Sequence, residues 1–171
     1  MDNDLYQIPT QVGEKKISIT IEMSSRSHPS VHFELYKSDC NWMTYWIFEP
    51  SFRDICLIAE QLNIRHLEWS TLRNQHDFRA ALQEFNPVYS HGVDFETAKA
   101  LDELCKNGLS ASTEKLWGQD GHAYLIELDG FSEKFLCWCI LPEEWGILKP
   151  VIDILVAYAK LNQKDYGCSI R

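Results

Sequence analysis

Two distant segments of the chain share one pattern, a strand-like run that contains a tryptophan, ends at a proline and is followed by an apolar, helix-like stretch. Trp46 lies four residues before Pro50, and Trp138 lies four residues before Pro142. After each proline the spacing of the apolar residues changes from about two to about 3.6 residues, as expected where a strand is followed by a helix. The sequence therefore predicts an α+β fold in which two β-meander-plus-helix units form one antiparallel-sheet domain.

We expect a single domain over residues 1–171, because a chain of this length with 45% hydrophobic residues can bury a core without disulfides or a structural metal. The first unit spans 16–63, a helical insertion spans 64–114, and the second unit spans 115–161. Pro150 lies inside the last helical pattern, so that helix either bends or restarts there. The apolar patterns predict strands at 16–23, 31–37, 42–48, 115–117, 123–128 and 134–141, and helices at 51–63, 75–85, 95–106 and 142–161.

Acidic residues outnumber basic ones, and they concentrate in the second half of the chain. The chain has 16 Lys and Arg residues against 25 Asp and Glu residues, a net charge of −9. Between Asp94 and Trp145 there are 11 acidic and four basic residues. Nucleic acid is not expected as a partner, because binding to phosphates needs a basic surface. Clustered negative charge favours a cationic protein partner, and it is equally typical of a surface that only keeps a protein soluble.

Aromatic residues beside acidic residues also favour a protein partner. Most of the six tryptophans and seven tyrosines are expected in the core or on the sheet. Trp69, Trp117 and Trp145 instead lie at the ends of predicted elements beside acidic residues, where they suit the anchors of a protein interface. The candidate partner-binding residues are Asp94, Glu96, Trp117, Asp120, Asp129, Glu143 and Glu144.

Catalytic and metal-binding patterns are weak in this chain. Cys137 and Cys139 share one face of a predicted strand near His122 in the sequence, but two further ligands at a recognisable spacing are missing, so no metal or cofactor is expected. A cysteine nucleophile needs a base, and nothing in the order or spacing pairs Cys40 with His91 or His122. The six cysteines are scattered, which favours free thiols in a reducing compartment.

The last third of the chain resembles a known group of proteins. The segment 116–124 leads to Trp138 and then to the segment 142–145. In a small, acidic α+β protein this combination resembles bacterial immunity proteins of contact-dependent inhibition and other polymorphic toxin systems. The resemblance implies a protein that is not an enzyme and that binds and neutralises a cognate toxin, often a cationic nuclease delivered by a neighbouring cell. It carries over no individual functional residue.

Two other functions are compatible with the sequence. A small enzyme with a Cys or His nucleophile would need a pocket that gathers Cys, His and Asp side chains, and an adaptor domain would need another cytoplasmic protein to bind. Residues 1–10 have neither the basic nor the apolar region of a secretory signal, and no apolar stretch is long enough to cross a membrane. We therefore expect a cytoplasmic protein without a membrane partner.

Overall fold

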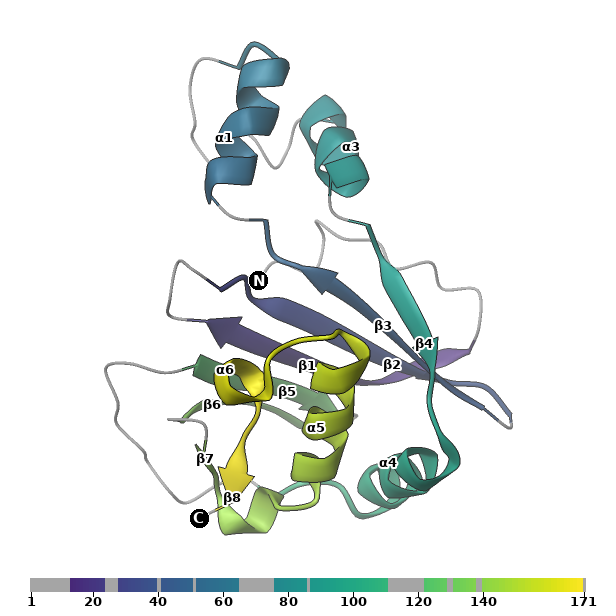
Figure 1. Ribbon diagram of the computed structural model, residues 1–171. Helices are drawn as coiled ribbons and strands as arrows, with labels where there is room; N and C mark the ends of the chain where they lie inside the picture. Colours follow the sequence, from purple (N-terminus) through teal and green to yellow (C-terminus); the bar gives the residue numbers. More distant parts are fainter. Residues whose placement is uncertain are drawn as a thin grey trace.

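The computed structural model describes residues 13–23, 28–39, 41–50, 52–64, 76–85, 87–110, 122–128, 131–137 and 140–170. Within them the chain has the expected α+β fold, with an antiparallel sheet and several helices (Figure 1). Some of the features predicted from the sequence lie outside the described residues, namely the strand at 115–117, Trp69, Trp117, Asp120, Asp129 and Trp138.

The main sheet has six strands in the order β4-β3-β2-β1-β5-β6, and each neighbouring pair is antiparallel. Because β1 pairs with both β2 and β5, the two halves of the chain share one sheet. A small second sheet pairs β7 with β8 in parallel. The strands are β1 Glu14–Met23, β2 Val31–Lys37, β3 Trp42–Phe48, β4 Tyr89–Gly92, β5 His122–Leu128, β6 Phe131–Cys137, β7 Ile140–Leu141 and β8 Ser169–Ile170.

The helices occupy two places in the molecule (Figure 1). α1 and α3 pack against each other beyond the ends of β3 and β4, and they bury a small core around Ile58, Phe78 and Leu82. α4 packs beside α5, and α5 covers one face of the sheet together with the short α6. The helices are α1 Phe52–Gln61, α3 His76–Phe85, α4 Phe95–Asn107, η2 Glu143–Trp145, α5 Leu148–Tyr158 and α6 Gln163–Tyr166.

Alternation along the strands decides which side chains meet α5. Ile17, Ile19 and Ile21 of β1 point to the helix face, because successive side chains of a strand point to opposite faces. Phe33 and Tyr124 from the neighbouring strands join them in the main core. The side of α5 that meets this layer consists of five buried apolar residues, Leu148, Val151, Ile152, Leu155 and Val156.

The sequence predicts the elements of the first unit and of the insertion with boundaries within two residues, except for one strand. β4 is not expected, because Pro87 before it and Gly92 at its end are typical of a loop. Pairing with β3 and stacking of the Tyr89 ring on the Trp46 ring hold this segment in the sheet. The insertion is therefore not purely helical, since it also supplies an edge strand.

The second unit differs from the expected meander. The sequence predicts one strand over 134–141, but β6 ends at Cys137 and β7 pairs with β8 in the second sheet. The last helix restarts rather than bends: η2 precedes α5, and Pro150 lies in the first turn of α5, where its missing N–H group is not needed. The repeat of a complete βββα unit stays a prediction, because Trp138 lies outside the described residues.

Candidate partner-binding site

Four of the seven candidate residues lie in the described part of the chain, and all four are exposed. Asp94 and Glu96 lie at the start of α4, whereas Glu143 and Glu144 belong to η2. The other three candidates lie outside the described residues, so the surface that they form is not part of the site described below.

Asp94 fixes the start of α4 as its N-cap residue. Its Oδ1 atom accepts a hydrogen bond of 3.0 Å from the Thr97 amide, and its Oδ2 atom accepts one of 2.6 Å from the Thr97 hydroxyl. The Tyr158 hydroxyl at the end of α5 donates a further hydrogen bond of 3.0 Å to Oδ2. The bonds from Thr97, with a smaller contribution from Tyr158, lower the pKa of Asp94 to about 2, so this carboxylate is charged at neutral pH.

Replacing Asp94 with alanine should lower the free energy of unfolding by about 1 kcal/mol, because two of the amide and hydroxyl donors at the start of α4 lose their acceptor. Asp94→Asn retains an acceptor oxygen and should cost less. Urea denaturation of the two variants at neutral pH measures both values. Equal stability of Asp94→Ala and the wild type would show that the cap contributes nothing to the fold.

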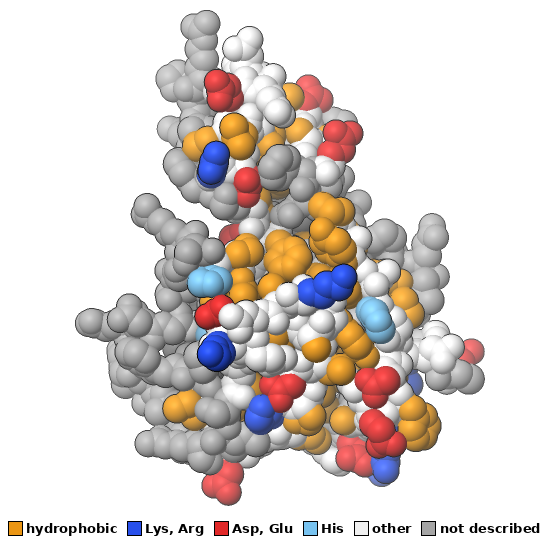
Figure 2. Space-filling model, viewed as in Figure 1, with side chains coloured by type: hydrophobic (Ala, Val, Ile, Leu, Met, Phe, Trp, Pro, Cys, Tyr) orange, Lys and Arg blue, Asp and Glu red, His pale blue; other side chains and the backbone are white. Residues whose placement is uncertain are grey.

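Phe95 is the most exposed large apolar residue described in the structure, since 80% of it is accessible to solvent. It is the first residue of α4, and its neighbours in the sequence are the acidic residues Asp94 and Glu96. Figure 2 shows acidic side chains, with apolar ones among them, gathered at the lower right of the molecule, where α4 lies. Single exposed apolar side chains are common on protein surfaces, but a largely exposed aromatic ring with acidic neighbours in the sequence also suits a contact surface for another molecule.

The strand before α4 extends this surface. The Tyr89 ring is 43% exposed and stacks on the Trp46 ring, with 5.7 Å between ring centroids. The His91 ring stacks on the Tyr158 ring at 4.1 Å, and its Nδ1 donates a hydrogen bond of 2.6 Å to the Gly92 carbonyl oxygen. These groups are exposed along one stretch of chain, which we call the β4–α4 surface: Val88, Tyr89, His91, Asp94, Phe95 and Glu96.

The acidic candidates in η2 form a separate patch. The Trp145 Nε1 group donates a hydrogen bond of 2.9 Å to the carbonyl oxygen of Ser110, which places η2 beside the far end of α4. At about 1.5 Å per residue α4 is about 20 Å long, and this length separates Glu143 and Glu144 from Asp94. Among the described candidates, Asp94 and Glu96 therefore lie apart from Glu143 and Glu144. Trp145 is fully buried, so the expectation that it is an interface anchor is wrong.

Another acidic residue of α4 belongs to the fold rather than to the site. Asp102 forms an ion pair with Lys37 and accepts a hydrogen bond of 3.0 Å from the Trp42 Nε1 group. The hydrogen bond from Lys37 lowers the pKa of the Asp102 carboxyl group. These contacts connect α4 to the ends of β2 and β3.

The face of the sheet away from α5 carries a row of buried polar side chains that sequence reasoning missed. Thr20 Oγ1 lies 2.7 Å from His32 Nδ1, and His32 Nε2 lies 3.4 Å from Glu34 Oε1. Glu34 also accepts hydrogen bonds from the Tyr36 hydroxyl and the Lys15 amine. Burial raises the pKa of Glu34, but the bonds from His32, Tyr36 and Lys15 together outweigh it and lower the pKa to about 2.

This row of a hydroxyl, an imidazole and a carboxylate has the order of a catalytic triad, but a nucleophile must be accessible to its substrate. Thr20 is 3% exposed, His32 is 4% exposed, and Glu34 is 8% exposed. The alternation of His32, Glu34 and Tyr36 along β2 is a visible signal for a polar face. The burial of that face is not visible in the sequence, and it favours a structural role for the row.

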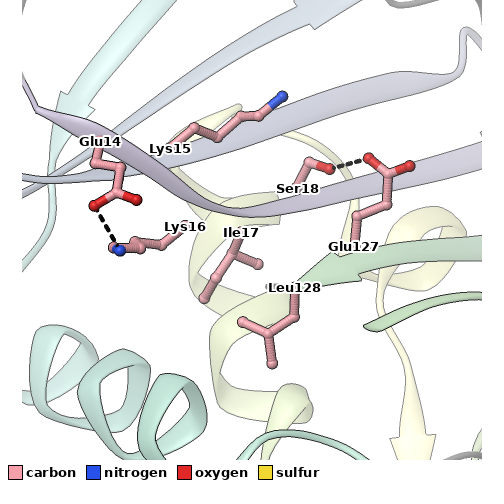
Figure 3. Close-up of a pocket in the computed structure, with 7 residues that line it drawn as sticks. All are labelled: Glu14, Lys15, Lys16, Ile17, Ser18, Glu127 and Leu128. Atoms are coloured by element: carbon pink, nitrogen blue, oxygen red, sulfur yellow. Dashed lines mark hydrogen bonds and ion pairs between the residues drawn. The ribbon is translucent and has the colours of Figure 1, made fainter. Parts of the chain in front are cut away.

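One pocket of about 230 Å³ lies where β1 extends past the end of β5 (Figure 3). The Ser18 hydroxyl donates a hydrogen bond of 2.7 Å to Glu127, and Glu14 forms an ion pair with Lys16. None of its lining residues is Cys, His or Asp, so this pocket offers no support for an enzyme with a Cys or His nucleophile. They are Glu14, Lys15, Lys16, Ile17, Ser18, Glu127 and Leu128.

The described cysteines and histidines form no cluster that could hold a metal ion together with acidic residues. Cys56, Cys105 and Cys168 are not in disulfide bonds, and Cys40 lies outside the described residues. His122 Nε2 lies 2.7 Å from the Tyr124 hydroxyl, and burial lowers the pKa of its imidazole. His122 therefore belongs to the packing of β5, not to a site on the surface.

Comparison with known proteins gives no further information on this site. Within the described residues, no helix has both the length and the apolar character needed to cross a lipid bilayer. No protein-family model matches the chain, and no curated protein or solved structure matches it either.

Proposed function

We propose that this chain is an immunity protein that binds and neutralises a cognate, basic toxin domain, and that the β4–α4 surface makes the contact. The observation that carries this proposal is the exposed ring of Phe95, whose neighbours in the sequence are the acidic residues Asp94 and Glu96. The resemblance in the last third of the chain supports the same class of protein. The chain would act in the cytoplasm, where free thiols are stable.

The chemistry of this surface fits a basic protein better than other partners. Burying a Phe side chain against a partner contributes about 1.5–3 kcal/mol. The carboxylates of Asp94 and Glu96 attract Lys and Arg side chains and repel acidic proteins and nucleic acids. The net charge of −9 also attracts basic proteins and repels acidic ones, and it does so over a longer range.

Neutralisation follows directly if the toxin is a nuclease. A nuclease holds the phosphates of its substrate with Lys and Arg side chains. An acidic protein that covers those side chains would compete with the nucleic acid and block the toxin without any chemical step. We therefore expect the toxin surface in contact with Phe95 to be basic.

The test uses the product of the gene next to that of this chain. Co-expression should give a complex that purifies intact, and the chain should protect cells that produce the toxin. Failure of the wild-type chain both to bind and to protect would contradict the proposal. Binding without protection would favour an adaptor domain instead.

Charge reversal should show which of the two acidic patches attracts the toxin. Glu96→Lys should slow association with the toxin about tenfold or more at low salt, because long-range attraction mainly sets the association rate. Glu143→Lys changes the charge of the chain by the same amount on the other patch, and it should have a much smaller effect. Stopped-flow association rates at two salt concentrations measure this difference. Equal effects of the two variants would show that the net charge of the chain, and not the β4–α4 surface, attracts the toxin.

A further inference from the structure

β4 forms one edge of the main sheet, and among the described residues no strand pairs with its outer side. It has β3 as its neighbour in the strand order, and all four of its residues are exposed. The Val93 amide donates a hydrogen bond of 3.0 Å to the Trp42 carbonyl oxygen. In an antiparallel pair the bonded positions alternate, so the peptide groups of His91 and Tyr89 face β3, and those of Ser90 and Gly92 face outward.

We propose that β4 binds an extended, basic segment of the partner as an additional antiparallel or parallel strand of the sheet. This inference rests on the proposed function and specifies how the partner binds. The outward N–H groups of Ser90 and Gly92 and the C=O group of Ser90 would pair with the backbone of the added strand, whereas the Gly92 C=O group already accepts the hydrogen bond from His91 Nδ1. Such pairing gives affinity without regard to side chains, so the flanking side chains must supply the specificity.

The side chains around β4 favour a basic segment. On the helix face, Tyr89 and His91 would lie beside alternate side chains of the added strand. The stacked, half-exposed Tyr89 ring offers a flat face to an Arg or Lys side chain. Asp94 and Glu96 follow the end of β4, where they can pair with a second basic side chain.

Charge also decides against a second copy of this chain as the added strand. Pairing of β4 with β4 would bring together two chains that each carry a net charge of −9. Like charges brought into such proximity oppose association. A basic segment is attracted instead, because each of its Lys or Arg residues offsets part of the negative charge near β4.

Ser90→Pro tests this proposal with little change to the fold. Proline removes the outward N–H group and places its ring on the outer side, and proline is tolerated in edge strands at such positions. Ser90→Ala is the matched control, because it keeps the N–H group. With the product of the neighbouring gene as the probe, Ser90→Pro should weaken binding about tenfold or more, whereas Ser90→Ala should bind as the wild type does.

Amide hydrogen exchange of the wild-type chain gives a second readout, which does not depend on the Ser90→Pro variant. In the complex, the amides of Ser90 and Gly92 should exchange at least about tenfold more slowly than in the free chain. If these amides are not protected while Phe95→Ala still weakens binding, strand addition is wrong and the proposed function stands. Protection of the same amides in a dimer of the chain alone would overturn the assignment of the occupant. If the wild-type chain does not bind the probe, the proposed function itself fails.

Discussion

Replacing Phe95 with alanine should make the complex with the toxin dissociate about 30-fold faster, because truncation of a buried aromatic anchor costs about 2 kcal/mol or more. The association rate should change little, since the carboxylates of Asp94 and Glu96 remain in place. The stability of the free chain should change by less than about 0.5 kcal/mol, because a side chain that is 80% exposed has little packing to lose. Surface plasmon resonance and urea denaturation measure these quantities.

Leu57→Ala is the matched control for this experiment. Leu57 is also an exposed apolar residue, at 41%, but it lies on α1 outside the β4–α4 surface. The Leu57→Ala variant should associate with the toxin and dissociate from it at the same rates as the wild type. A dissociation rate for Phe95→Ala that equals the rate for Leu57→Ala would remove the observation on which the proposed function rests.

The sequence predicted the parts of the fold whose patterns are local. The alternation of Ile17, Ile19 and Ile21 identifies a half-buried strand, because one face of such a strand must be apolar. β4 has no such pattern, since all four of its residues are exposed and its place depends on pairing with β3. A strand of this kind is defined by its neighbour in space, which the order of residues does not reveal.

The candidate site was predictable only in part for the same reason. Asp94 and Glu96 stand out as acidic residues before a helix, but the sequence does not show that α4 separates them from Glu143. Phe95 was not among the predicted site residues, because its helical spacing from Ala98 and Leu101 does not distinguish it from the apolar face of the helix. The ring nevertheless remains in solvent, whereas Leu101 is fully buried and Ala98 packs against the core.

The double role of Asp94 affects how the surface should be tested. Its carboxylate is both a charge on the β4–α4 surface and the N-cap of α4. A charge reversal at Asp94 would therefore change the attraction for a partner and the stability of the helix at once. Glu96 is in the first turn of α4 but is not the N-cap residue, so a charge reversal there costs the helix only its dipole interaction of about 0.3–1 kcal/mol and makes Glu96 the better position for changing charge.

Glu34→Gln should destabilise the fold more than any variant at the β4–α4 surface, by about 3 kcal/mol at neutral pH. The carboxylate of Glu34 is 8% exposed and accepts hydrogen bonds from Tyr36 and Lys15. Glutamine keeps the shape of the side chain but removes the charge on which these bonds depend. Glu14→Gln is the control, because its exposed ion pair with Lys16 is worth less than about 1 kcal/mol.

The pH dependence of unfolding tests the same group in the wild-type chain. The pKa of Glu34 is about 2 in the folded state, compared with 4.5 for an unperturbed glutamate. A lowered pKa means that the folded state holds the proton less tightly, so the stabilisation is complete above pH 4.5 and is lost as the pH falls towards 2. The free energy of unfolding should therefore fall more steeply in this range for the wild type than for Glu34→Gln. Parallel curves for the two proteins would show that the buried row does not depend on the charge of Glu34.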